Sequence, residues 1–190
     1  MKVGFVNATS LKRHIHPFRE FLTNDPSFDV MGVAESRLGN VVDDHIVSCD
    51  GYSIIRQDRN TQGGGLILYI RNSFRAKVLA HSETEVLGKP LQTEFLICKV
   101  WSDDIPAILL CLIYRPSKII LFNANSDLLC NLRDYCSSYS HKVIMGDLNA
   151  DLLINSGDRN LFYNIADELS LQVVQHNATH RPPGSTEPKT

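Results

Sequence analysis

Five short apolar segments follow one another through the middle of the chain, and this run constrains the fold more than any other feature. They occupy residues 52–56, 65–70, 77–80, 94–101 and 107–114, and each has the length of an ordinary strand. Residues 1–6, 30–34, 143–145 and 171–174 show the same pattern before and after them. The chain is therefore predicted to be rich in β-strands.

Helices are expected between the strands at both ends of the chain. Apolar residues at helical spacing predict one helix with Pro17 in its first turn, one within residues 121–139 and one over residues 160–169. Residues 36–50 lack a period and are expected to form a surface loop. No repeat or linker divides the chain. We predict one α/β (α+β) domain over residues 1–190, with two sheets packed face to face and helices outside them.

Composition narrows the possible partners and the compartment. Nineteen Lys and Arg against 21 Asp and Glu leave a net charge of -2, so binding of nucleic acid would require a local basic surface or metal ions. The longest apolar runs are far shorter than the roughly 20 residues of a membrane-spanning helix. The five cysteines form no C-x-x-C pair and favour free or buried thiols. With no secretory signal visible, an intracellular protein without membrane contact is expected.

Polar residues directly follow several predicted strands. The apolar residues 143–145 lead into Gly146-Asp147-Leu148-Asn149-Ala150-Asp151, where carboxylates and an amide alternate. Such oxygen ligands suit Mg²⁺, which prefers one or two carboxylates with water and phosphate completing its shell. Gly, Asp and Asn are also the usual turn residues, so this segment alone fits either a metal site or a solvated turn.

Two further strand ends carry matching groups, since Asn7 follows one apolar strand and Glu35 follows another. Each alone fits a cap or turn residue, but three such strand ends together favour a metal and phosphate site assembled from distant segments. A fourth strand ends in Tyr114-Arg115-Pro116. Its phenol could donate a hydrogen bond to a phosphate and Arg115 could add charge, although an isolated tyrosine there more often packs on the core.

Five motifs occur in an order that resembles one known family. This order is that of the endonuclease domain of non-LTR (LINE-type) retrotransposons, most similar to the jockey and R1-like elements. That domain belongs to the endonuclease/exonuclease/phosphatase superfamily, with deoxyribonuclease I and the apurinic/apyrimidinic endonucleases. The resemblance spans nearly the whole chain and rests on Val6-Asn7-Ala8-Thr9-Ser10-Leu11, Val33-Ala34-Glu35-Ser36, Gly63-Gly64-Gly65-Leu66-Ile67-Leu68-Tyr69-Ile70, Leu112-Ile113-Tyr114-Arg115-Pro116 and Gly146-Asp147-Leu148-Asn149-Ala150-Asp151.

The resemblance implies a DNase I-like four-layer sandwich with mainly antiparallel sheets and a metal-dependent hydrolase activity. Glu35 would be the principal ligand of Mg²⁺, or of Mn²⁺, and Asn7 would also belong to the metal site. Tyr114 would contact the scissile phosphate, with Arg115 also binding substrate. Asp147 would orient or deprotonate the attacking water, and Asn149 would hold the phosphate. The reaction would nick target DNA and leave a 3′-hydroxyl for a reverse transcriptase domain, in the nucleus for an active element.

The sequence also departs from that family. Members of the superfamily finish with a strand bearing an Asp and then a Ser-Asp-His motif, and neither occurs here. Residues 179–188 resemble the segment just before that strand, so the domain is expected to lack its last strands and its activity to be impaired. Asp43-Asp44-His45 imitates the motif but lies in the early loop, where it is interpreted as ordinary surface polarity.

Two alternative functions remain open at this point. One is a phosphatase or phosphodiesterase of the same superfamily acting on small phosphorylated substrates, and the other is a non-catalytic remnant that binds nucleic acid or protein. The Gly63-Gly64-Gly65 run lacks the Lys and Ser/Thr of a P-loop, so a tight turn into a strand is expected there. The neighbouring basic residues could contact DNA, although a solvated basic face is the commoner meaning of such a cluster; they are Arg56, Arg59, Arg71, Arg75 and Lys77.

Overall fold

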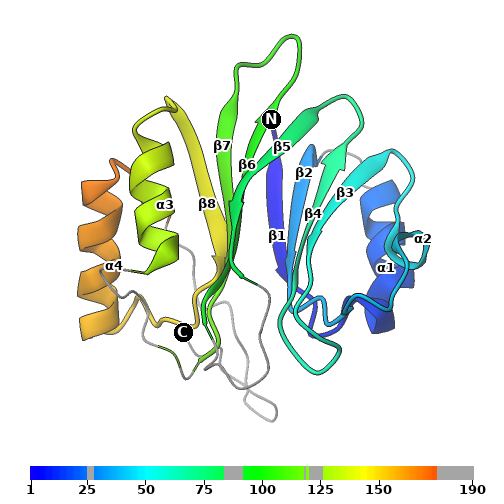
Figure 1. Ribbon diagram of the computed structural model, residues 1–190, viewed down its shortest axis with the longest axis horizontal. Coiled ribbons are helices and arrows are strands. Elements are labelled where there is room, and N and C mark those ends of the chain that lie inside the picture. The colour runs from blue at the N-terminus through cyan, green and yellow to red at the C-terminus, as the bar shows by residue number, and fades with distance from the viewer. Residues whose placement is uncertain (25–27, 84–91, 118, 120–125, 175–190) are drawn as a thin grey trace.

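Two four-stranded sheets form the centre of the molecule (Figure 1). The computed structural model describes residues 1–24, 28–83, 92–117, 119 and 126–174. In the first sheet, β1 and β2 are parallel and the other neighbours antiparallel, in the order β1 (Val3–Asn7), β2 (Val30–Ala34), β4 (Leu66–Arg71) and β3 (Tyr52–Gln57). In the second sheet only β7 and β8 are parallel, in the order β5 (Arg75–His81), β6 (Glu94–Trp101), β7 (Ile108–Tyr114) and β8 (His141–Asp147).

Helices cover the outer face of each sheet, which makes four layers (Figure 1). On the first sheet lie α1 (Leu11–Asn24) and the short α2 (Asp44–Val47), and beside the second lie α3 (Asp127–Cys136) and α4 (Gly157–Glu168). The predicted α/β sandwich of two mainly antiparallel sheets flanked by helices is confirmed.

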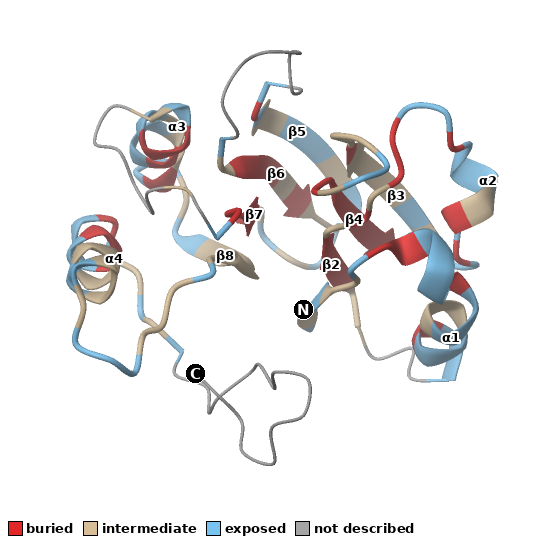
Figure 2. Ribbon diagram, turned by 90° about the horizontal axis from the view of Figure 1, so that it is seen from below, coloured by how far each residue is buried: buried red, intermediate tan, exposed pale blue. Residues whose placement is uncertain are grey.

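Successive side chains of a strand point to opposite faces of its sheet, and this alternation explains why the core has three parts. Leu66, Leu68 and Ile70 of β4 face the second sheet, whereas Ile67 and Tyr69 face α1. Strand β7 alternates in the same way between the first sheet and α3. Because both faces of these central strands are covered, no charged residue interrupts residues 66–70 or 108–114, and Figure 2 shows these strands as mostly buried.

Several element bounds differ from the prediction. The first helix begins at Leu11, so Pro17 lies inside it and not in its first turn. Leu11 and Ile15 are buried with Leu22, so the apolar face of the helix extends upstream of the proline. Within the expected loop over residues 36–50, residues 44–47 form α2.

The predicted strand over residues 171–174 is wrong. The chain leaves α4 through Ser170 at φ 54, and Leu171 donates its N–H to the carbonyl of Ala166. No strand pairs with residues 171–174 in the described structure, and Val174 is exposed. The predicted helix within residues 121–139 is confirmed only over Asp127–Cys136, and residues 120–125 lie outside the described part. The same holds for the motif-like segment over residues 179–188.

The five cysteines form no disulfide, as predicted, and four of them are buried. Among the residues described, no helix has the length and apolar character needed to cross a membrane.

Candidate functional site

Four strands end at the same edge of the sandwich. Strands β1 and β2 run parallel with Asn7 opposite Ala34. Asn7 and Glu35, the residue after Ala34, therefore lie close together at the ends of these strands. Strands β7 and β8 run parallel with Tyr114 opposite Asp147, which brings those two together in the second sheet. Because β1, an edge strand of the first sheet, contacts β8, an edge strand of the second, the two pairs meet.

One amide group joins the two sheets at this edge. The Nδ2 atom of Asn7 donates to Oε1 of Glu35 at 3.1 Å and to Oδ2 of Asp147 at 2.8 Å. Both carboxylate oxygens therefore lie within about 6 Å of each other. The Oδ1 atom of Asn7 accepts from the backbone N–H of Thr9 at 3.0 Å, which fixes this orientation of the amide. Asn7 thus holds two carboxylates together, and its oxygen faces the backbone.

Tyr114 completes the group from β7. Its hydroxyl is hydrogen-bonded to the carboxylate of Glu35. Partial burial and the nearby negative charge of Glu35 raise the pKa of Tyr114 to about 12, so the phenol keeps its proton at neutral pH and remains a donor. Burial alone would raise the pKa of Glu35, but hydrogen bonds from Arg37 and Asn7 outweigh it and lower the pKa below its usual value.

Arg37, which the sequence analysis did not single out, lies against Glu35. Its Nη2 atom forms a short ion pair with Oε2 of Glu35. Backbone hydrogen bonds hold this segment on both sides, from Leu11 to the carbonyl of Ser36 and from Arg37 to the carbonyl of Gly64. Opposite charges two residues apart are the one signal in the sequence that could have indicated this pair, although the left-handed backbone of both residues does not follow from it.

Asn149 and Arg115 are close to the site but have other partners. Asn149 donates its backbone N–H to Oδ1 of Asp147 at 3.0 Å, and its side-chain amide donates to the carbonyl of Arg115 at 2.7 Å. The guanidinium of Arg115 is buried and donates to the carbonyls of Leu148, Asn149 and Ile119. Arg115 therefore holds the turn that follows Asp147, and it would have to give up these partners to contact a phosphate. Its role as a substrate ligand stays a prediction.

The backbone around the site is strained. Six non-glycine residues of the described chain have a left-handed φ, and all but Ser170 lie in the segments that carry the site: Thr9, Ser10, Glu35, Arg37, Asn149 and Ser170. Such conformations are costly and persist where surrounding structure enforces them, as they commonly do at functional sites.

A buried ion pair supports the glycine turn beside Glu35. Glu94, at the start of β6, accepts from Arg59 Nη1 at 2.7 Å and from the backbone N–H of Gly65 at 2.6 Å. Gly64 and Gly65 have φ values of 64° and 88°, as expected for a tight turn into a strand. Neither Glu94 nor this role of Arg59 was anticipated from the sequence.

The basic cluster near this turn is neutralised by acidic partners. Arg56 pairs with Asp44 and Asp58, whereas Arg59 pairs with Glu94. At the other end of the strands, Arg71 and Arg75 pair with Asp29 and Asp103, respectively. The charges of these arginines are therefore already paired within the protein, where they support the fold.

The donor set fits a hard divalent cation that keeps water ligands. Glu35 and Asp147 supply two carboxylates, and no group of three or more His, Cys, Asp and Glu side chains able to hold a metal occurs among the residues described. Mg²⁺ binds through one or two carboxylates with water and phosphate, whereas a structural zinc site needs four protein ligands. The site therefore suits Mg²⁺ or Mn²⁺ better than zinc.

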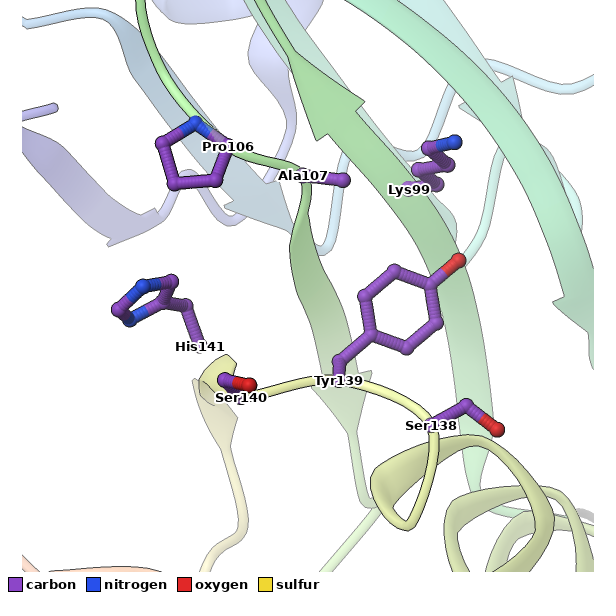
Figure 3. Close-up of a pocket in the computed structure, with 7 residues that line it drawn as sticks. All are labelled: Lys99, Pro106, Ala107, Ser138, Tyr139, Ser140 and His141. Atoms are coloured by element: carbon purple, nitrogen blue, oxygen red, sulfur yellow. The ribbon is translucent and has the colours of Figure 1, made fainter.

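A separate hollow of about 460 Å³ lies at the opposite end of the second sheet (Figure 3). It is lined near the starts of β7 and β8, whereas Tyr114 and Asp147 lie at the ends of these strands. Pro106, Ala107, Tyr139 and His141 line it together with Lys99. No carboxylate lines it, so it lacks the groups that a hard cation would require.

Comparisons with known proteins support the fold. No family model and no curated protein matches the chain. Among solved structures, a 3′ phosphatase from Neisseria bound to a product DNA hairpin is similar at a TM-score of 0.59 and 15% identity, over 88% of this chain and 70% of that chain. An AP endonuclease from Archaeoglobus fulgidus gives 0.56 and 16% over 88% and 70%. The human Nocturnin catalytic domain with bound sulfate gives 0.58 and 13% over 83% and 66%.

These similarities show the fold and leave the activity to be inferred from the site. The chain spans about two thirds of the length of these structures. The DNase I-like arrangement expected from the sequence motifs is thus confirmed.

Proposed function

We propose that this chain is a divalent-metal-dependent endonuclease that hydrolyses phosphodiesters of DNA. The observation that carries the proposal is the convergence of Glu35 and Asp147 on one amide of Asn7, from strands of two different sheets. The motif resemblance further supports the target-site nicking endonuclease of a non-LTR retrotransposon, with a reverse transcriptase domain and nuclear action. Similar folds in a DNA-bound 3′ phosphatase and an AP endonuclease agree with a nucleic-acid substrate.

Each residue of the site has a role that its surroundings favour. A bound divalent cation would neutralise charge on the phosphate and so stabilise the transition state. Glu35 would hold that cation, and Asn7 would keep the two carboxylates in register. Asp147 would accept a proton from the attacking water, because each carboxylate oxygen accepts one hydrogen bond, from Asn7 or from the backbone of Asn149, and keeps a further lone pair. The protonated Tyr114 would donate a hydrogen bond to a phosphate oxygen.

Nicking of supercoiled plasmid tests this function, because a single cut converts the substrate to a separable product. We expect slow nicking in Mg²⁺ that stops in EDTA, because the Ser-Asp-His motif that the resemblance places at the phosphate does not occur in residues 1–190. Asp147→Asn should lower the rate about 10²-fold or more by removing the proton acceptor, and Glu35→Gln should raise the Mg²⁺ concentration required for half-maximal rate.

Two controls separate the proposal from its alternatives. Arg133→Gln alters an exposed ion pair between α3 and α4 and should leave nicking unchanged. Hydrolysis of an inositol phosphate is measured in parallel, since a small-substrate phosphatase would prefer it. Nicking that survives Asp147→Asn, or a preference for the inositol phosphate, would contradict the proposal.

A further inference from the structure

Arg37 lies at the point where a divalent cation would approach Glu35. The side chain is 28% exposed and its guanidinium contacts Oε2 of Glu35. Both residues have left-handed φ values near 50°, and the Ser36 between them is fully buried. The backbone therefore fixes Arg37 beside the carboxylate, while the end of its side chain can reorient.

The guanidinium of Arg37 also has fewer hydrogen-bond partners than those of Arg56 and Arg115 near this edge. In the described structure its guanidinium has the carboxylate of Glu35 as its hydrogen-bond partner, and its buried Nε has none. By contrast, Arg56 and Arg115 each donate to several carbonyls besides their acidic partners. A guanidinium with unused donors and one exchangeable partner is suited to a second anion.

We propose that Arg37 exchanges partners: it neutralises Glu35 in the metal-free protein, and it binds a DNA phosphate once a divalent cation has taken its place. This inference rests on the proposed function, because it takes Glu35 as the metal ligand. A guanidinium and a divalent cation on one carboxylate repel each other, so the arriving cation displaces Arg37. The released guanidinium stays near the cation, because Arg37 is only two residues from Glu35. A phosphate that completes the cation's shell would therefore lie within its reach.

Metal affinity is the first measurement. Calorimetric titration with Mn²⁺ alone should show Arg37→Gln binding about tenfold more tightly than wild type, because the competing charge is gone. Arg37→Lys keeps the charge and should stay within about twofold of wild type. Arg75→Gln removes the same charge at the far end of β5, where its partner is Asp103, and should leave the affinity unchanged.

DNA binding is the second measurement, by fluorescence anisotropy of a short duplex over a range of NaCl concentrations. With Ca²⁺ present, Arg37→Gln should reduce the slope of log affinity against log salt by about 0.9, the loss of one phosphate contact. In EDTA its slope should equal that of wild type, because Arg37 is then held by Glu35. A merely structural role would not produce a change confined to the cation-containing buffer.

The outcomes separate this inference from the proposed function. Mn²⁺ binding that Glu35→Gln leaves intact would show that the metal site itself is misplaced. Mn²⁺ binding that depends on Glu35, but is unchanged or weaker in Arg37→Gln, would overturn the exchange alone. An equal change of slope in EDTA and in Ca²⁺ would also overturn it. If Arg37→Gln fails to fold, Arg37→Ala replaces it with the same expected results.

Discussion

At the scale of single residues, the position of Asp147 depends on the glycine before it. Gly146 has φ 152, and a Cβ atom there would lie 1.9 Å from the carbonyl oxygen of Ile113 on the neighbouring strand. Backbone cannot move aside as a flexible side chain can. Glycine therefore allows β8 to stay paired with β7 up to the carboxylate of Asp147.

Gly146→Ala should therefore destabilise the protein by about 2–4 kcal/mol, because the new methyl group forces β8 away from β7. Gly157→Ala is the matched control, since nothing lies within 4 Å of a Cβ at that helical position. It should change stability by less than about 1 kcal/mol, in the stabilising direction. Urea denaturation of the two variants decides the matter, and equal midpoints would refute the steric argument.

At the scale of elements, the start of β6 supports the end of β2 through the glycine turn. Glu94 holds Arg59 and Gly65, and the carbonyls of Gly64 and Gly65 accept the N–H groups of Arg37 and Ser36. Both members of the Arg59–Glu94 pair are nearly buried. Removing one charge therefore takes a close counter-ion from the other in a poorly solvated place.

A double-mutant cycle on this pair should give a large coupling. Glu94→Gln alone should cost about 3 kcal/mol, whereas the pair Arg59→Gln with Glu94→Gln should cost less than the sum of the single changes by about 1–3 kcal/mol. The same cycle on Arg133 and Glu168, an exposed pair joining α3 to α4, should give a much smaller coupling. Thermal unfolding measures both cycles, and equal couplings would mean that Glu94 and Arg59 are effectively solvated.

Elements were predictable where local pattern and burial agree. Strands β2 and β6 have the predicted bounds because their apolar runs end at polar or glycine-rich turns. The strand expected over residues 171–174 failed because a strand also needs a paired neighbour, which no local pattern reveals. Proline at position 17 suggested a helix start, yet the buried face of α1 extends on both sides of it.

The sequence predicted the residues at the strand ends of the site, but it did not predict the contacts that hold those residues in place. Asn7, Glu35, Tyr114 and Asp147 stand directly at or after strand ends. Parallel pairing brings them together two by two, and the contact between β1 and β8 brings the two pairs to one edge. The ion pair of Glu94 with Arg59 joins residues far apart in the chain, and such contacts depend on the packing of two sheets. The Asn7 amide donates to Glu35 and Asp147, which follow or end other strands, and the guanidinium of Arg115 donates to the carbonyl of Asn149 after β8. These contacts likewise depend on residues far away in the sequence.

At the scale of the whole molecule, the site exists only while the two sheets keep their spacing. Asn7 and Glu35 belong to the first sheet and its edge, whereas Tyr114 and Asp147 belong to the second. Between them, a Cβ added at Gly32 would lie 2.6 Å from Cε of Met145 and 2.8 Å from Cδ1 of Leu112. This glycine is therefore where the sheets approach closely behind the site.

Gly32→Val should separate the sheets locally, lower stability by about 1–3 kcal/mol and weaken Mn²⁺ binding. Leu132→Ala, in the core under α3, should cost about 2–5 kcal/mol without changing the Mn²⁺ affinity of the folded protein, because that core lies on the other face of the second sheet. Calorimetric titration below the unfolding temperature compares the two. Equal Mn²⁺ affinities of the two variants would contradict the claim that the spacing of the sheets determines the geometry of the site.

The central claim is that one divalent cation binds at Glu35, close to Asp147, and iron-directed cleavage of the polypeptide tests it most directly. Fe²⁺ replaces Mg²⁺, and with ascorbate and peroxide it generates radicals that cut the backbone near the metal, whatever the protein's activity. We expect cuts clustered around residues 7, 35, 114 and 147, suppressed by excess Mg²⁺ and absent in Glu35→Gln. Cuts centred instead on Asp43-Asp44-His45, or unchanged in Glu35→Gln, would contradict the account.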